Sequence, residues 1–151
     1  MSWQAYIDDS LIASGFMHSA AIVSLADGSY WAYGGTAIPQ PAEVKHILQI
    51  LNDLTLVQSS GVTVGGVKYF GLQSGNDGES KYFFFKKGAA GGCVYTTKQA
   101  FIIGVYGNPG DASSLDSELH KSSAKADVPV NPADCNATVK RIADYLIKLG
   151  Y

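Results

Sequence analysis

The chain has 151 residues, 46% of them hydrophobic and 16% charged, with a formal net charge of −2, which suits one globular domain spanning residues 1–151. Bulk nucleic-acid binding is not expected at this charge. No apolar run reaches the roughly 18 residues that cross a membrane, and the chain starts without the basic residues and apolar stretch of a secretory signal, so we expect a soluble cytoplasmic protein.

The first expected element is a helix that Ser2 caps and that runs to about Ser14. Apolar and small residues recur there at three- and four-residue spacing, as on one helical face. Those residues are Trp3, Tyr6, Ile7, Ser10 and Leu11. Gly15 then offers a left-handed stop.

A β-hairpin and a second helix are expected next. Residues 19–25 and 29–33 are short apolar strands separated by Asp27-Gly28, a strong hairpin signal. The helix begins at Pro41 and ends at about Leu54, with Glu43 in its first turn and His46 at the edge of its apolar face. That face consists of Val44, Ile47, Leu48 and Leu51.

Four or five further strands follow in the middle of the chain. The candidates are residues 62–64, 67–73, 81–87, 93–97 and 100–106. Glycine-rich turns separate them, and the run from Gly88 to Gly92 is interpreted as a wide turn. Because parallel neighbours need crossovers of a dozen or more residues, these short connections predict an antiparallel meander.

Residues 107–130 interrupt this pattern and are rich in Gly, Asp, Ser and Lys, so we expect an exposed insertion with one short helix at most. A final helix then starts at Asn131 and Pro132 and is closed by Gly150. Its apolar stripe is Cys135, Val139, Ile142, Leu146 and Leu149, with Tyr145 on the flank. The predicted class is α+β, a central antiparallel sheet of about six or seven strands with helices at both chain ends.

Catalytic and metal-binding patterns are missing from the sequence. No histidine has a partner at metal-ligand spacing, and no nucleophile elbow, phosphate loop or dinucleotide fingerprint occurs. Cys93 and Cys135 are expected to be reduced, small apolar residues. We therefore expect a binding protein without cofactor or metal rather than an enzyme.

Charge is distributed unevenly along the chain. Residues 1–60 contain five acidic residues and one lysine, whereas residues 61–106 contain five lysines and two acidic residues. An anionic partner is therefore expected to meet the middle segment.

Aromatic residues at the two chain ends form the clearest signal for binding. Trp3 and Tyr6 share a helical face, Trp31 lies in an early strand, and Tyr145 and Tyr151 close the chain. Such rings are either ordinary core or, if exposed together, a groove for a polyproline II ligand. The residue pattern leaves both interpretations open.

The segments Trp3-Gln4-Ala5-Tyr6-Ile7-Asp8 and Ala143-Asp144-Tyr145-Leu146-Ile147 closely resemble the terminal signatures of profilins. Further matches fall in the family's order between them, so that the resemblance covers nearly all of the chain outside 107–130. They are Ala20-Ala21-Ile22-Val23, Trp31, Gly65-Gly66-Val67-Lys68-Tyr69, Lys86-Lys87-Gly88 and Gly104-Val105-Tyr106.

This resemblance implies a protein that binds monomeric actin and is associated with the cytoskeleton. It further implies terminal helices that pack together on one face of the sheet. It also implies a separate groove for proline-rich partners such as formin-type assembly factors. The groove positions are Trp3, Tyr6, Trp31, Tyr145, Leu146, Leu149 and Tyr151. The actin positions are Lys68, Gln73, Lys87 and Asn136, with Lys86 and Lys98 as neighbours. Many relatives carry arginine where this chain has Gln73, so a charge-assisted bond is missing there.

Two further expectations concern the 107–130 insertion and binding to phosphoinositides. The 107–130 insertion is atypical of the family, and Leu115 and Leu119 on one face of a short helix are hypothesised to add contact with actin; a disordered loop is the alternative. The lysines suggest weak phosphoinositide binding.

The alternative class is a non-catalytic scaffold or small-ligand sensor domain, in which the terminal aromatics would be core.

Overall fold

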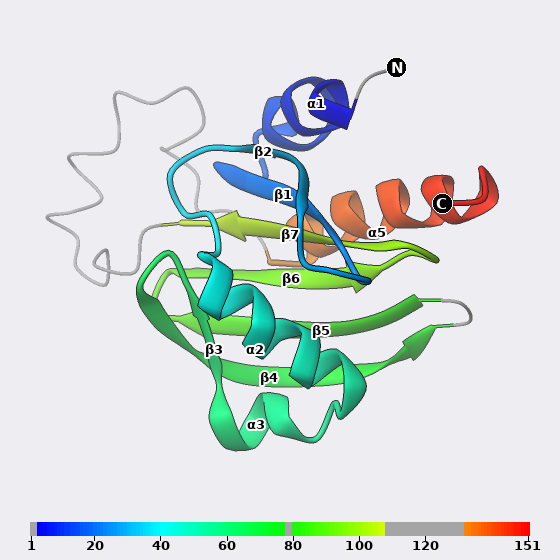
Figure 1. Ribbon diagram of the computed structural model, residues 1–151. Coiled ribbons are helices and arrows are strands. Elements are labelled where there is room, and N and C mark those ends of the chain that lie inside the picture. Colours follow the sequence, from blue (N-terminus) through cyan, green and yellow to red (C-terminus); the bar gives the residue numbers. More distant parts are fainter. Residues whose placement is uncertain (1–2, 78–79, 108–131) are drawn as a thin grey trace, which may run out of the picture.

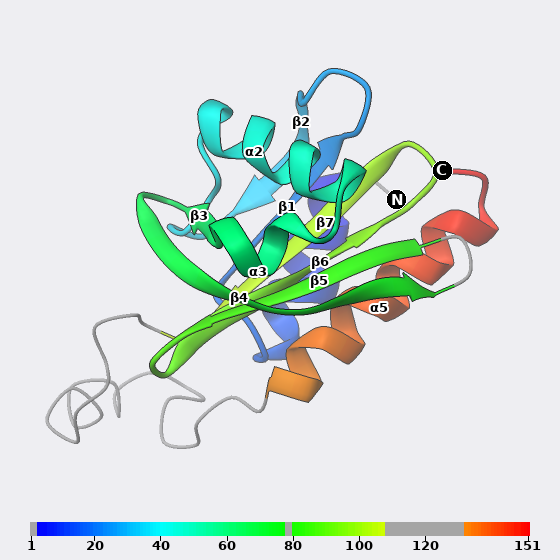
Figure 2. The ribbon, with the colours of Figure 1, turned by 90° about the horizontal axis from the view of Figure 1, so that it is seen from below.

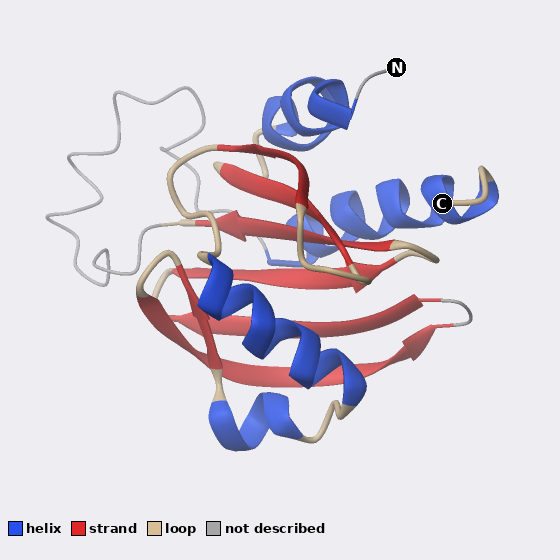
Figure 3. Ribbon diagram, viewed as in Figure 1, coloured by secondary structure: helices blue, strands red, loops and turns tan. Residues whose placement is uncertain are grey.

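The computed structural model describes residues 3–77, 80–107 and 132–151, which fold around one antiparallel sheet of seven strands in the order β2-β1-β7-β6-β5-β4-β3 (Figure 1). The strands are β1 (Ser19–Ser24), β2 (Tyr30–Gly34), β3 (Val62–Val64), β4 (Val67–Asp77), β5 (Ser80–Lys87), β6 (Ala90–Thr96) and β7 (Ala100–Tyr106). Helices cover both faces, with α2 and α3 on one side and the two terminal helices on the other (Figures 2 and 3). The predicted α+β class and antiparallel meander are confirmed.

The N-terminal helix is not a regular α-helix. It consists of α1 (Trp3–Ala5), a π-helical segment η1 (Tyr6–Leu11) and a 3₁₀ turn η2 (Ile12–Ser14), and it ends at Gly15 with φ 80° as expected. The wider i→i+5 repeat brings residues five apart onto one side. Ile7 and Ile12 accordingly both lie against the backbone of Gly34 in β2, within about 3 Å of where a Cβ would be. The sequence predicted one helix to about Ser14, and this packing accounts for the π-helical and 3₁₀ segments found in its place.

The hairpin between β1 and β2 has a five-residue loop, residues 25–29, rather than a tight two-residue turn. The Asp27 carboxylate accepts hydrogen bonds from the backbone N–H of Ser29 (3.0 Å) and from its hydroxyl (2.7 Å). These bonds hold the pKa of Asp27 below its ordinary value. The loop is therefore ordered by a local side-chain turn.

The second helix, α2 (Pro41–Asn52), buries Val44, Ile47 and Leu51 as predicted, and also Ile50. Glu43 does more than favour the positive helix end. Its carboxylate accepts hydrogen bonds from the N–H of Gln40 (2.8 Å), of Gly65 (2.8 Å) and of Gly66 (2.9 Å). It thus ties the start of α2 to the turn between β3 and β4.

One short helix, α3 (Leu56–Ser60), was not predicted from the sequence. A single helical turn is too short to show a 3.6-residue repeat. Val57 is its buried residue, and the Val57 carbonyl oxygen lies 1.6 Å from where a Cβ on Gly71 would be. Only glycine therefore lets α3 approach β4 at this point.

The glycine run 88–92 is not a wide turn, because β6 already begins at Ala90 and Lys87 pairs with it. The turn is the two residues Gly88 and Ala89. Gly92 lies in the middle of the sheet, where a Cβ would be 2.1 Å from the carbonyl oxygen of Gly104. The glycine serves close packing of the central strands rather than a turn.

The last helix, α5, spans Pro132–Lys148 as predicted, with Asn131 outside the described residues. Its buried residues are Cys135, Thr138, Val139, Ala143 and Leu146. Leu149 departs from the predicted stripe and is 50% exposed. The reason is that it follows the end of the helix, where Gly150 (φ 97°) turns the chain back toward the sheet.

Two cores lie on opposite faces of the sheet. One packs α2 and α3 against residues such as Tyr69, Phe83 and Phe85, and the other packs the terminal helices against residues such as Ile22 and Ile102. No helix among the described residues is long and apolar enough to cross a membrane.

Cys93 and Cys135 meet in the second core, where both are free thiols and fully buried. Burial, with the neighbouring Cys135 thiol, raises the pKa of Cys93 well above its ordinary value. The Cys93 thiol therefore stays protonated, and the complete burial of both thiols is that of small apolar residues.

Tyr106 makes this core sensitive to alkaline pH. Burial and the nearby Cys135 and Cys93 thiols raise its pKa to about 12. The folded protein keeps this proton, while the unfolded chain releases it above about pH 10. The contribution of Tyr106 to the free energy of unfolding is therefore fully present below that pH and is lost as pH rises through 12. Between pH 8 and 11 the wild type should lose about 1 kcal/mol more unfolding free energy than Tyr106→Phe. Urea denaturation at both pH values measures this difference, and equal losses would refute it.

Candidate functional site

The N-terminal helix and α5 lie on the same face of the sheet (Figures 1 and 2). Five aromatic rings meet there, from α1, η1, β2, α5 and the residue that follows α5. Trp3 is central, with ring centroids 4.7 Å from Trp31, 4.9 Å from Tyr151 and 5.8 Å from Tyr6. Tyr6 is in turn 6.3 Å from Tyr145. We call these five residues the terminal ring cluster.

Trp31 joins the terminal ring cluster because of a β-bulge. In the register between β1 and β2, Ile22 pairs with Ala32 and Val23 with Tyr30, so that Trp31 is an extra residue on β2. Bulges redirect side chains in this way. Trp31 packs on the same core as Trp3, whereas Tyr30 packs on the opposite core.

The terminal ring cluster combines a buried base with an exposed surface. Tyr6 is buried and Trp3 and Trp31 are half-buried, while Tyr145 and Tyr151 are 49% and 41% exposed. Leu146 has no exposed surface. We therefore do not count it among the residues proposed to contact a ligand, since it belongs to the buried core on this face of the sheet.

Burial raises the pKa of Tyr6, and the nearby Tyr145 and Tyr151 hydroxyls raise it further. The Tyr6 phenol therefore keeps its proton at neutral pH and remains able to donate a hydrogen bond.

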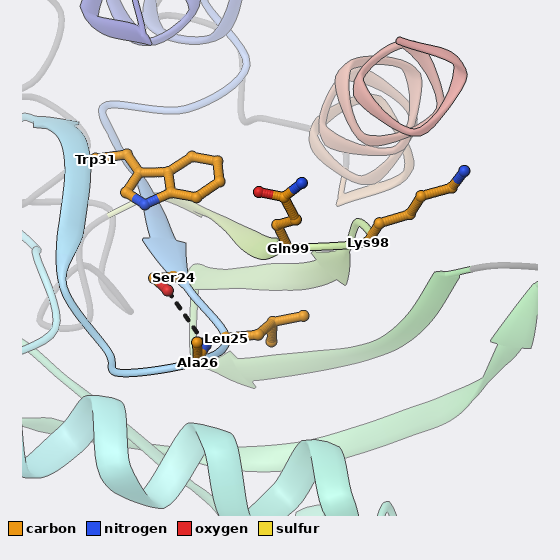
Figure 4. A pocket seen from close by; sticks show the side chains of 6 residues that line it. All are labelled: Ser24, Leu25, Ala26, Trp31, Lys98 and Gln99. Carbon is orange, nitrogen blue, oxygen red and sulfur yellow. Dashed lines mark hydrogen bonds between the residues drawn. The ribbon is translucent and has the colours of Figure 1, made fainter. Parts of the chain in front are cut away.

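A cavity of about 350 Å³ adjoins the terminal ring cluster at Trp31 (Figure 4). It is lined by Ser24, Leu25, Ala26, Trp31, Lys98 and Gln99. The end of β1 and the turn between β6 and β7 form its walls, and the hydroxyl of Ser24 accepts the N–H of Ala26 at 3.2 Å.

A second surface lies on β4 and β5, on the sheet face that α5 partly covers. Phe70 pairs with Lys86 across these strands and therefore shares a face with it, and Lys68 lies two residues earlier on the same face. Phe70 is 74% exposed, and Leu72 is also exposed. We call Lys68, Phe70, Leu72 and Lys86 the Phe70 face.

Two more positions that the resemblance assigns to actin binding are Gln73 on β4 and Asn136 on α5. Gln73 is exposed and sits in a bulge, because Leu72 and Gln73 together oppose the single Phe84 of β5. Asn136 is in the first turns of α5, and its Oδ1 is buried with no hydrogen-bond partner among the described residues. Such an acceptor is usually satisfied, and this one has no surface that an external partner can reach without movement of the side chain.

The family model for profilin matches residues 1–151. The chain belongs to the profilin family. A profilin of Trypanosoma brucei brucei is 72% identical over 151 residues, which is all of both chains. Profilin II of Acanthamoeba castellanii superposes with a TM-score of 0.74 at 30% identity, covering 99% of this chain and 100% of the other. The resemblance seen in the sequence is thereby confirmed.

A more distant profilin structure includes a ligand. Mouse profilin IIa was solved in complex with a double repeat from the FH1 domain of mDia1, and it superposes with a TM-score of 0.66 at 21% identity over all of both chains. At that identity the likeness shows the shared fold.

The profilin positions Lys87 and Lys98 do not join the Phe70 face. Lys87 follows Lys86 on a strand and therefore starts on the opposite side of the sheet. Lys98 lies beyond the far end of β6, about 20 Å from the turn that follows Lys86, and lines the cavity at Trp31. Both therefore lie outside the Phe70 face, and their contact with actin stays a prediction. Leu115 and Leu119 lie outside the described residues.

Sequence reasoning missed Phe70 and Leu72, although a signal for them exists. Tyr69 is buried among the core residues of β4, and strand alternation then turns Phe70 outward between Lys68 and the bulge. Phe70 and Leu72 together expose apolar surface, and it is contiguous exposed apolar surface that marks interaction sites.

Proposed function

We propose that this profilin binds proline-rich segments through the terminal ring cluster and an actin monomer through the Phe70 face, and that it regulates actin filament assembly in the cytoplasm by joining the two. The observation that carries the proposal is the position of Trp3, whose ring lies within 6 Å of three other rings while part of its surface stays open. No covalent chemistry is required.

The terminal ring cluster suits a polyproline II ligand for two physical reasons. Proline rings pack on aromatic faces, and the ligand loses little entropy because its backbone is already extended. The tyrosine hydroxyls and tryptophan N–H groups can donate to the ligand's free carbonyl groups. The exposed rings of Tyr145 and Tyr151, with Leu149 beside them, provide the open side of the groove.

The mouse profilin IIa complex supports this use of the fold, because its partner is a formin-type FH1 repeat. In this chain the ring geometry supports the same use, and formin-type assembly factors are the partner class that we propose.

The Phe70 face suits a protein partner. An exposed aromatic residue flanked by Lys68 and Lys86 offers an apolar anchor with a basic rim. Phosphoinositides rank below actin here, because each lysine near an anionic membrane contributes only about 1 kcal/mol.

The two surfaces are far enough apart to be occupied at once. Trp31 lies on β2 and Phe70 on β4, which are five strand positions apart in the sheet. At about 4.8 Å per strand this is about 24 Å along the sheet. One molecule can therefore hold an actin monomer while a proline-rich factor is docked.

The alternative of a scaffold or small-ligand sensor requires the terminal aromatics to be core. Tyr145 and Tyr151 are exposed, and Trp3 and Trp31 are not fully buried. The geometry therefore favours peptide binding.

Tryptophan fluorescence titrated with a polyproline peptide tests the first part of the proposal, and binding to monomeric actin tests the second. We expect saturable binding in both titrations and a ternary complex when all three are mixed. Mutually exclusive binding of the two partners would contradict the joining role.

A further inference from the structure

The C-terminal residue of the terminal ring cluster is held by the turn between β6 and β7. A main-chain oxygen of Tyr151 accepts hydrogen bonds from the backbone N–H of Gln99 (2.6 Å) and from the hydroxyl of Thr97 (2.9 Å). On its other side, the N–H of Tyr151 donates to the carbonyl oxygen of Leu146 (2.9 Å). The backbone of Tyr151 is therefore fixed from both the sheet and the helix.

Thr97 makes these contacts from a buried position. Its side chain is 3% exposed, so it cannot touch a ligand in the groove. Its oxygen accepts the N–H of Ala100 at 3.1 Å, and its proton faces the main-chain oxygens of Tyr151 (2.9 Å) and Ala100 (3.2 Å). The shorter of the two distances is to Tyr151. The hydroxyl thus links the turn to the end of the chain.

The ring of Tyr151 depends on this anchor for its place against Trp3. The two rings meet edge to face, with centroids 4.9 Å apart and planes at 82°. Tyr151 follows the end of α5, and its side chain is 41% exposed, so the helix alone would leave it free to fray. A ring that must first be ordered binds its ligand more weakly than one already in place.

We propose that Thr97 is a positioning residue for the proline-rich ligand: its hydroxyl holds the Tyr151 backbone so that the Tyr151 ring closes the groove over Trp3. This inference rests on the proposed polyproline binding and deepens it. The hydroxyl acts through Tyr151 and has no contact with the ligand itself.

Calorimetric titration with a polyproline peptide tests the inference in the full-length protein. Thr97→Val keeps the shape and removes the hydroxyl, and we expect Kd to rise about fivefold to tenfold, the size that one lost hydrogen bond and one loosened residue support. Thr97→Ser restores the hydroxyl and should bind as the wild type does. Thr138→Val is the matched control, since it removes a buried hydroxyl bonded to Asp134 on α5, away from the cluster.

The decisive comparison uses Tyr151→Ala as background. Once that ring is absent, Thr97→Val should weaken binding no further, whereas a general effect on stability would persist. If Thr97→Val does not fold by circular dichroism, Thr97→Ala replaces it in the same comparison. Wild-type affinity in the hydroxyl-free variant, or an equal loss in both backgrounds, overturns the inference alone. A wild type that does not bind polyproline overturns the proposed function as well.

Discussion

Trp3→Ala should weaken polyproline binding by about 2 kcal/mol or more, which is about 30-fold in Kd, while the domain stays folded. The reason is the central position of this ring, which contacts Tyr6, Trp31 and Tyr151. Its removal deletes one surface for the ligand and also removes the ring against which Tyr6, Trp31 and Tyr151 pack. Calorimetric titration with a polyproline peptide measures the loss.

Tyr33→Ala is the matched control for this experiment. Tyr33 is an exposed aromatic residue on the same strand as Trp31, but it contacts Tyr30 edge to face outside the terminal ring cluster, at 5.8 Å between centroids. Its loss should leave polyproline affinity unchanged. Both variants should keep the wild-type circular dichroism spectrum, which reports the fold, and should still bind actin. An equal loss in the two variants would show that the Trp3 effect is not specific to the cluster.

Much of the fold is predictable from local signals. Pro41 and Pro132 at first helical positions and the short connections between apolar runs together predict α2, α5 and the antiparallel order of the strands. The outward flank of Tyr145 on α5 also follows from helical spacing alone.

The features that sequence reasoning missed depend on tertiary packing. The π-helical turn of η1 forms because Ile7 and Ile12 both fit against Gly34, a contact between residues far apart in the chain. The bulge that redirects Trp31 arises from the register with β1, which no local pattern reveals. The misread glycine run has the same cause, since Gly92 is required by its neighbours across the sheet.

The candidate site shows the same division. Residue types and their order predict a ring cluster formed largely by the chain ends, yet only the three-dimensional structure shows that Leu146, predicted with the rings, has no exposed surface. Likewise, Lys98 lines the cavity at Trp31 and is not part of the Phe70 face, to which Lys86 belongs. Sequence distance within a meander says little about which end of the sheet a turn occupies.

Phe70→Glu should weaken actin binding by at least about 2 kcal/mol, or about 30-fold, without lowering the stability of the free protein. Phe70 is 74% exposed, so the substitution disturbs no core packing, but in a complex it would replace an apolar anchor with a carboxylate that has to be desolvated.

Tyr33→Glu is the control with the same change of charge at an exposed aromatic residue, because Tyr33 pairs with Ala21 on the opposite face of the sheet. Titration of fluorescently labelled monomeric actin measures both variants. Since the Phe70 face and the terminal ring cluster are separate, Phe70→Glu should retain full polyproline affinity. Unchanged actin binding in Phe70→Glu, or the same loss in Tyr33→Glu, would place the actin contact on another part of the molecule.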